Sequence, residues 1–212
     1  MELKGKKIDF LGDSLTEGMG ASAPEFGFVE IVGREAGLAA ARNYGISATR
    51  IACQSTAVDG KSDENFCARA QDMDPDADIV VILGGTNDYG HGDAPLGTPQ
   101  DRTRHTFYGA CREMILTVRQ RCPRAVIVIG TPTHRADEEK PNRWGVTLET
   151  YVDILRETAK RYALPVFDLF AMDDFRPGLA PEKEYFCEDG LHPYNSGYRL
   201  IAERLIAFLR AL

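Results

Sequence analysis

Two short polar segments contain the residue types that nucleophilic catalysis needs. Ser14 follows a short apolar run and a glycine, and its hydroxyl becomes an effective nucleophile only when a base takes its proton. His192 offers such a base because imidazole changes charge near neutral pH. Asp189 precedes it across a glycine-containing turn and could fix its tautomer. A plainer explanation exists for both segments, since Ser and Asp favour helix starts and Asp189 could cap backbone donors.

Two further segments offer hydrogen-bond donors. Acyl transfer builds negative charge on the former carbonyl oxygen, so donors must already point at it. Asn87 follows the most apolar run and carries an NH2 group, while a backbone N–H of residues 43–49 could add a second donor. Asn and Asp are also common turn formers, and we expect Asp88 to brace the Asn87 turn rather than act as a base. Glu17 is expected to be a first-turn carboxylate that the helix dipole favours.

The pattern of the chain predicts how these segments are positioned. Short apolar runs alternate with segments of helical period, which predicts a parallel sheet with helices on both faces. We expect strands at Lys7–Leu11, Ala41–Ile46, Asp78–Leu83, Ala125–Ile129 and Pro165–Leu169, and helices at Phe26–Ala36, Thr106–Arg121, Thr147–Tyr162 and Ser196–Leu212. One α/β domain over residues 1–212 is therefore predicted. Its ligand crevice should lie at the carboxyl ends of the strands, where the polar segments fall.

Composition excludes several classes of function. The net charge of −7 argues against binding to nucleic acid or to anionic membranes, which require a field of Lys and Arg. No apolar run reaches the length of a membrane span, and the first residues do not resemble a signal peptide. We therefore expect a cytoplasmic protein whose five cysteines are reduced thiols. No histidine pair has metal-ligand spacing on a helix, so neither a metal nor another cofactor is expected.

At the level of motifs, the chain resembles the SGNH hydrolases, also called GDSL esterases and lipases. The resemblance rests on Gly12-Asp13-Ser14-Leu15, Gly85-Thr86-Asn87-Asp88 and Asp189-Gly190-Leu191-His192-Pro193. It implies a flavodoxin-like three-layer α/β/α sandwich with a parallel sheet of about five strands. It also implies a triad in which Ser14 is the nucleophile, His192 the base and Asp189 its orienting partner.

The same resemblance implies an oxyanion hole built from the Ser14 N–H, the Asn87 amide and the N–H of residue 48. Ala48 stands where the family has glycine. Alanine keeps the N–H donor, but it would be strained at a positive φ, and its methyl group would narrow the acyl side of the pocket. A GxSxG sequence is missing, so the chain does not resemble an α/β-hydrolase.

The expected substrate is a short acyl ester, with acetyl groups on carbohydrate as the first hypothesis. Aromatic side chains beside polar groups suit a sugar ring better than a fatty acyl chain, and Tyr89–Tyr108 resembles small bacterial carbohydrate-esterase members of the family. The candidate substrate-binding residues are Asp13, Tyr89, His134, Trp144 and Tyr194, with His91, Asp93, Tyr185 and Phe186 in the same loops. Trp144 could instead be a hydrophobic lid contact.

Two other functions stay open. A lysophospholipase or acyl-thioesterase would use the same triad but would need an apolar acyl channel. A non-catalytic flavodoxin-like binding protein would use Ser14 as a phosphate-facing cap, although the chain has no GxxxxGK[ST] loop. The expected partner is thus a small-molecule or oligosaccharide ester. The sequence makes no prediction about oligomeric state.

Overall fold

Five parallel strands form the centre of the computed structural model, which describes residues 1–55, 63–172, 176–177 and 189–212. The strands are β1 (Lys7–Gly12), β2 (Ala40–Gly45), β3 (Ile79–Leu83), β4 (Val126–Gly130) and β5 (Val166–Phe167), in the sheet order β2-β1-β3-β4-β5. This confirms the predicted five-stranded parallel sheet. The fifth strand is shorter than expected because Asp168 accepts a hydrogen bond from the N–H of Ala171, which begins a 3-10 turn, η2 (Leu169–Ala171).

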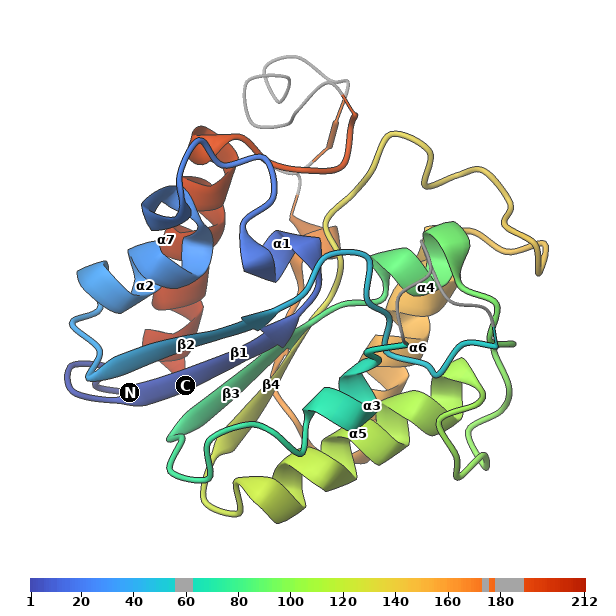
Figure 1. Cartoon of the computed structure of the whole chain (residues 1–212), viewed down its shortest axis with the longest axis horizontal. Coiled ribbons are helices and arrows are strands. Elements are labelled where there is room, and N and C mark those ends of the chain that lie inside the picture. The colour runs from blue at the N-terminus through green and yellow to red at the C-terminus, as the bar shows by residue number, and fades with distance from the viewer. Residues whose placement is uncertain (56–62, 173–175, 178–188) are drawn as a thin grey trace.

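Four long helices fall where helical periodicity predicts them: α2 (Phe28–Glu35), α5 (Phe107–Arg121), α6 (Leu148–Arg161) and α7 (Asn195–Ala211). The first of these begins two residues late because Pro24–Phe26 form a separate 3-10 turn, η1. Three short helices accompany them: α1 (Ser14–Glu17), α3 (Phe66–Arg69) and α4 (Thr86–His91). Of the three, α1 and α4 lie near the carboxyl ends of the strands, where the polar segments of the sequence meet (Figure 1).

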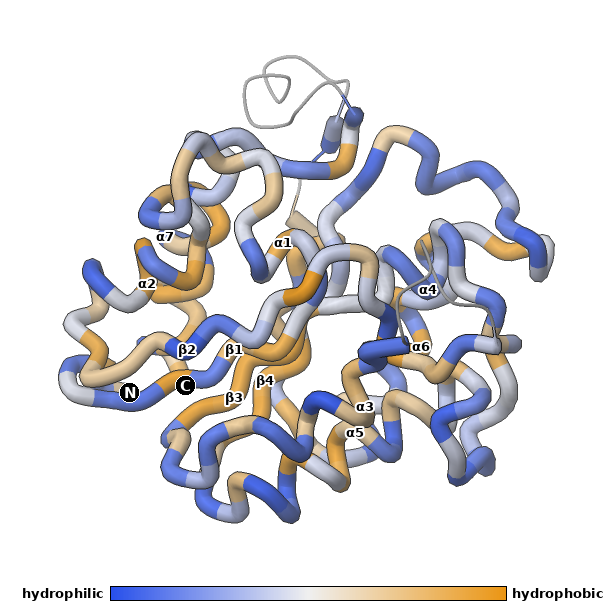
Figure 2. Tube along the Cα trace, in the orientation of Figure 1, coloured by the Kyte–Doolittle hydropathy of each residue, from blue (hydrophilic) through white to orange (hydrophobic). Residues whose placement is uncertain are grey.

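The sheet is covered on both faces, which makes a three-layer sandwich. Helices α2 and α7 cover one face, and α3, α5 and α6 cover the other (Figure 1). Successive strand residues alternate between the two cores: Ile79 and Val81 face α2 and α7, whereas Val80 and Ile82 face α5. The central strands are accordingly apolar along their length (Figure 2). These observations confirm the flavodoxin-like fold class.

The position of β1 brings distant segments together. It lies between β2 and β3, so the chain leaves β1 towards one side of the sheet and later crosses to the other, the arrangement that opens a crevice in such sheets. Gly12 pairs with Gly45 on one side and with Leu83 on the other. A Cβ on Gly12 would lie 1.9 Å from Thr16 Oγ1, and one on Gly45 would lie 2.2 Å from the Glu17 nitrogen. Glycine at both positions therefore lets α1 sit directly against the strand ends.

The cysteines are free thiols where the structure describes them. Cys67, Cys111 and Cys122 are buried and Cys53 is half-buried, whereas Cys187 lies outside the described residues. Among the helices described, none has both the length and the apolar character that a membrane crossing requires. The described side chains also contain no group of three or more His, Cys, Asp or Glu that could hold a metal ion.

Candidate active site

Ser14 is the first residue of α1, directly after β1. Asp13 caps this short helix by accepting the Leu15 N–H at 3.0 Å, and Gly18 ends it in a left-handed conformation with φ of 99°. The Ser14 side chain is nearly buried, with 5% of the residue exposed. The turn forced by Gly12 and the cap from Asp13 thus fix the serine at the strand end, as the sequence predicts.

His192 and Asp189 form a hydrogen-bonded line with Ser14. His192 Nε2 lies 2.9 Å from Ser14 Oγ, and His192 Nδ1 lies 2.6 Å from Asp189 Oδ2. Burial raises the pKa of Asp189, but hydrogen bonds from the His192 side chain and from nearby backbone N–H groups outweigh it, so the pKa is lowered. An ionised carboxylate at Nδ1 leaves Nε2 free to take the serine proton. This arrangement has the geometry of an activated nucleophile.

The turn that carries Asp189 and His192 is held on two sides. Asp189 Oδ1 accepts the N–H groups of Leu191 and His192 at 2.9 and 3.0 Å, which locks the carboxylate onto its own turn. From outside, the Ala136 N–H donates to the Gly190 carbonyl at 2.9 Å. Gly190 has a φ of 65°, and a Cβ there would lie 2.5 Å from the Ala136 Cβ. Glycine is thus required for both the turn and its contact with the neighbouring loop.

Ala48 adopts the left-handed conformation for which glycine is suited, with φ of 63°. The backbone angle that the sequence left open is therefore positive. Residues on both sides hold it in place. The Ser47 N–H and hydroxyl both donate to Glu17 Oε2, and Thr49 Oγ1 donates to the Ile46 carbonyl at 2.6 Å. Glu17 thus has a contact role that the helix-dipole interpretation did not anticipate.

Arg69 joins the same turn to the strand ends. Its Nη2 donates to the Gly12 carbonyl at 3.0 Å and to Thr49 Oγ1 at 2.8 Å, and its Nη1 donates to the Tyr44 carbonyl at 2.5 Å. Burial lowers the pKa of Arg69 to about 10. No motif in the sequence predicts a role for Arg69. The available signal was a single arginine in an otherwise apolar segment, after an Asn65 that caps α3.

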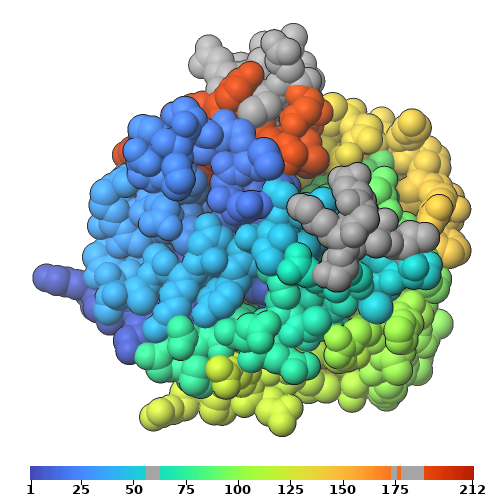
Figure 3. Space-filling view, in the orientation of Figure 1, coloured from blue at the N-terminus to red at the C-terminus, as the bar shows by residue number. Residues whose placement is uncertain are grey.

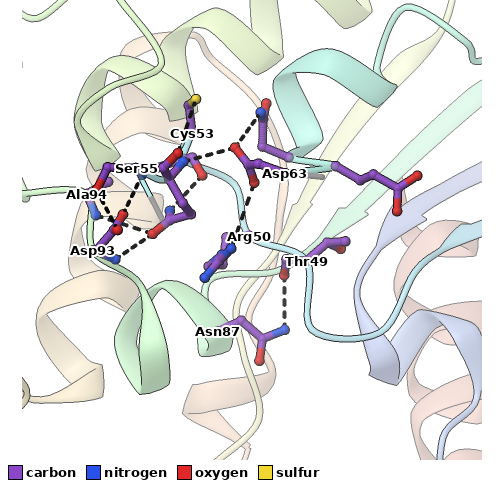
Figure 4. A network of polar contacts seen from close by, with 12 residues as sticks. Thr49, Arg50, Cys53, Ser55, Asp63, Asn87, Asp93 and Ala94 are labelled. Carbon is purple, nitrogen blue, oxygen red and sulfur yellow. Dashed lines mark hydrogen bonds and ion pairs between the residues drawn. The ribbon is translucent and has the colours of Figure 1, made fainter. Parts of the chain in front are cut away.

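Asn87 and Asp88 of α4 contact the segment that follows Ala48. The Asn87 amide donates from Nδ2 to the Thr49 carbonyl at 3.0 Å (Figure 4). Asp88 accepts the N–H groups of Ile51 and Ala52 at 2.9 and 3.0 Å. Burial raises the pKa of Asp88 to about 6. Asp88 therefore braces the segment at residues 51–52, whereas we expected it to brace the Asn87 turn. Both Asn87 and Asp88 are nearly buried.

The structure distributes the predicted substrate-binding residues over different environments. Asp13 is buried beside Ser14, and its Oδ2 has no hydrogen-bond partner among the residues that the structure describes. The Tyr89 ring is buried, and its hydroxyl lies 2.5 and 2.7 Å from the carbonyl oxygens of Asp137 and Lys140. Buried His134 pairs with Glu138 through Nδ1 at 2.8 Å. A substrate contact stays a prediction for all three.

The remaining candidates are more accessible. Trp144 and Tyr194 are 42% and 41% exposed, and Tyr194 follows His192 by two residues. Tyr185 and Phe186 lie outside the described residues. On the face drawn in Figure 3, the segment near residues 14–20, the segment near 45–50 and the segment after 188 adjoin one another. The first and last motif segments of the sequence thus lie beside the loop near residues 45–50.

Comparison with known proteins gives a consistent result. The GDSL-like lipase/acylhydrolase family matches residues 10–200. One crystal structure is 31% identical with a TM-score of 0.88 and covers 100% of this chain and 99% of its own. A protein from Lactobacillus plantarum is 26% identical with a TM-score of 0.81, over 99% of this chain and 98% of that one. A two-domain esterase active on acetylated mannans shares the fold at 19% identity and a TM-score of 0.65, over 99% of this chain and 49% of that one. A search of curated proteins found no match.

Proposed function

The chain belongs to the GDSL-like lipase/acylhydrolase family and is an esterase-type hydrolase; from that premise we propose that it removes short acyl groups, acetyl above all, from carbohydrate esters through a Ser14–His192–Asp189 triad. The observation that carries the proposal is the line of hydrogen bonds from Ser14 Oγ through His192 to Asp189, at 2.9 and 2.6 Å. Such a line is the arrangement that a serine nucleophile requires.

The proposed reaction has two halves. His192 Nε2 takes the hydroxyl proton as Ser14 Oγ attacks the ester carbonyl, and the resulting imidazolium then protonates the departing alcohol. This leaves an acyl group on Ser14. Water, deprotonated by His192, attacks the acyl-enzyme and releases the carboxylic acid and the free serine. Asp189 keeps the proton on Nδ1 and stabilises the imidazolium.

The negative oxygen of both tetrahedral intermediates would be held by three donors: the Ser14 N–H, the Ala48 N–H and the second hydrogen of the Asn87 amide. One Asn87 hydrogen is already donated to the Thr49 carbonyl, which leaves the other for the oxyanion. Donors fixed before the reaction stabilise charge without reorganisation, and each is worth roughly 10²–10³ in kcat.

Three observations support a short acyl group on a sugar. Ala48 stands where the family has glycine, and we expect its methyl group to narrow the acyl side of the pocket beside the proposed oxyanion donor. Trp144 and Tyr194 offer exposed aromatic rings, and such rings bind sugar faces well. An esterase active on acetylated mannans shares the fold. The competing function in this family, a lysophospholipase or acyl-thioesterase, would require an apolar channel for a long acyl chain.

The test is the hydrolysis of p-nitrophenyl acetate, butyrate and octanoate, followed by acetylated mannan oligosaccharides. Ser14→Ala is compared with Ser22→Ala, a control serine whose hydroxyl accepts from Asn195. We expect acetate to be the best substrate, Ser14→Ala to be inactive and Ser22→Ala to match the wild type.

Three results would contradict parts of the proposal. Preference for octanoate would favour the lysophospholipase or thioesterase alternative. Retained activity in Ser14→Ala would remove the nucleophile assignment. A wild type that neither hydrolyses esters nor reacts with a fluorophosphonate serine probe would favour the non-catalytic binding protein.

A further inference from the structure

The orientation of the Asn87 side-chain amide is fixed by a hydrogen-bond partner on each side. On one side Nδ2 lies 3.0 Å from the Thr49 carbonyl oxygen, which can only accept. On the other side Oδ1 lies 3.1 Å from Nε2 of His91. Because the carbonyl requires the NH2 group on its own side, the oxygen must face His91, and His91 must carry a proton on Nε2.

The far side of the His91 ring gives the same answer independently. Arg50 Nη1 lies 3.4 Å from His91 Nδ1, and a guanidinium has only donors. Nδ1 must therefore be the unprotonated nitrogen, which again places the ring proton on Nε2. The Arg50 guanidinium can only donate and the Thr49 carbonyl can only accept. Both therefore require the same direction of donation, from Arg50 to His91, from His91 to Asn87 and from Asn87 to Thr49.

Arg50 is well placed to fix the ring. It is 3% exposed, and its Nη2 lies 3.9 Å from Asp63 Oδ1 (Figure 4). Its backbone carbonyl accepts the Phe66 N–H at 2.9 Å, at the start of α3. His91 itself lies at the last position of α4, four residues after Asn87 and one turn along the same helix. The guanidinium is thus buried while the imidazole is at the surface.

We propose that His91, oriented by Arg50, is a positioning residue that holds the Asn87 amide with its NH2 group turned towards the oxyanion hole. Without the Nε2 donor, only the Thr49 carbonyl opposes rotation of the amide about its last bond. The flipped amide would present its oxygen to the developing oxyanion and repel it. The proposal rests on the proposed function, because it assigns His91 a part in stabilising the acyl-transfer intermediates. His91 does not itself touch the substrate.

The kinetic test uses three substitutions at the exposed position 91. In His91→Gln the amide nitrogen occupies the place of Nε2 and can still donate to Asn87. In His91→Asn the amide nitrogen occupies the place of Nδ1, and the shorter side chain cannot reach Asn87. His91→Phe keeps a ring at this position but removes both ring nitrogens. We expect kcat for p-nitrophenyl acetate to fall roughly tenfold in His91→Phe and His91→Asn, less than the loss of a whole donor. KM should be unchanged, and His91→Gln should stay near wild type.

A spectroscopic readout tests the proposal without relying on turnover. Long-range ¹H–¹⁵N spectra of the wild type should show His91 as the neutral Nε2–H tautomer. The Asn87 side-chain amide resonances should move in His91→Phe and stay in place in His91→Gln. An Nδ1–H tautomer, or Asn87 resonances that are indifferent to His91→Phe, would overturn the proposal.

The two readouts separate the two proposals. An active wild type whose kcat is the same in all three variants overturns the role of His91 and leaves the esterase function intact. An inactive wild type contradicts the esterase function, and the spectra then decide whether His91 orients Asn87.

Discussion

Glu17 Oε2 accepts the backbone N–H of Ser47 at 2.6 Å, which joins the helix that begins with Ser14 to the loop that contains Ala48. This contact joins the segment proposed to supply the nucleophile to the segment proposed to supply one oxyanion donor. Arg69 holds the other end of the same loop through Thr49. The left-handed Ala48 is therefore restrained on both sides, as a strained residue near a reaction centre has to be.

Loss of the Glu17 contact should lower the rate more than the affinity. In Glu17→Ala we expect kcat for p-nitrophenyl acetate to fall roughly tenfold, because a loosened Ala48 N–H is a weaker oxyanion donor. KM should change little. The control is Glu25→Ala, which removes another exposed glutamate. Equal kcat values for the two variants would show that the loop keeps its geometry without Glu17.

Replacement of Ala48 by glycine should stabilise the protein. A left-handed non-glycine residue costs roughly 1–2 kcal/mol, offset by about 0.5–1 kcal/mol of extra backbone entropy that glycine loses on folding. Ala163, the other non-glycine residue with positive φ among those described, has φ of 52° and lies at the end of α6. We expect both glycine variants to gain up to about 1 kcal/mol in urea unfolding.

The two alanine variants should differ in selectivity. Only Ala48→Gly removes a methyl group beside the proposed acyl site. Only in this variant should kcat/KM for the butyrate ester rise relative to that for the acetate ester. An unchanged chain-length profile would place the Ala48 methyl away from the acyl group. A stability loss in both variants would mean that the surrounding contacts relieve the strain.

Asp189→Asn should separate folding from chemistry. The amide oxygen can still accept the backbone N–H groups of Leu191 and His192, so the turn should persist. The amide cannot support an imidazolium, and its NH2 group favours the wrong tautomer of His192. We expect kcat to fall roughly 10³–10⁴-fold, with an unchanged circular dichroism spectrum and thermal midpoint. A decrease below about tenfold would show that another group orients His192.

Asp13 should make stability depend on pH. Burial raises the pKa of Asp13 to about 7, and its Oδ2 is buried with no hydrogen-bond partner in the described part of the chain. The folded state therefore favours the protonated form, so this contribution to stability is present below the unfolded pKa near 4 and is lost as pH rises towards 7. The advantage of Asp13→Asn over wild type in unfolding free energy should grow between pH 4 and 7, by at most about a tenfold change in the folding equilibrium per pH unit. A pH-independent difference would contradict the raised pKa.

The elements that could be predicted are those whose local pattern is long or continuous. The β-branched runs of β3 and β4 and the apolar stripe of α7, with Ile201, Leu205 and Leu209 buried, determine their structure almost alone. Helices α3 and α4, of four and six residues, are too short for a periodic pattern to develop. Their position depends on contacts with segments far away in the chain.

The residues of the candidate site also divide into those that a sequence motif predicts and those that depend on distant contacts. Ser14, Asn87, Asp189 and His192 stand in motifs of recognisable spacing. The place of the first two at strand ends, and of the last two before the final helix, could therefore be predicted. Arg69 and Glu17 act through the carbonyl of Gly12 and the backbone of Ser47, and no sequence pattern identifies a side chain by the backbone group it binds. Asn87 and His91 were four residues apart on what proved to be a helix, and this spacing was the one available signal for their contact.

The hydrogen bond between Ser14 and His192 joins residues 178 positions apart. During synthesis, β1 and Ser14 leave the ribosome first. His192 follows only when the segment before α7 has emerged. Until then Ser14 lacks the base that we propose for it and is an ordinary alcohol. The same separation makes the chain divisible: a cut on the N-terminal side of Asp189 should yield one fragment with Ser14 and another with Asp189 and His192, and we expect ester hydrolysis only when the two reassociate. Such a pair would report the docking of the last helix by a colour change.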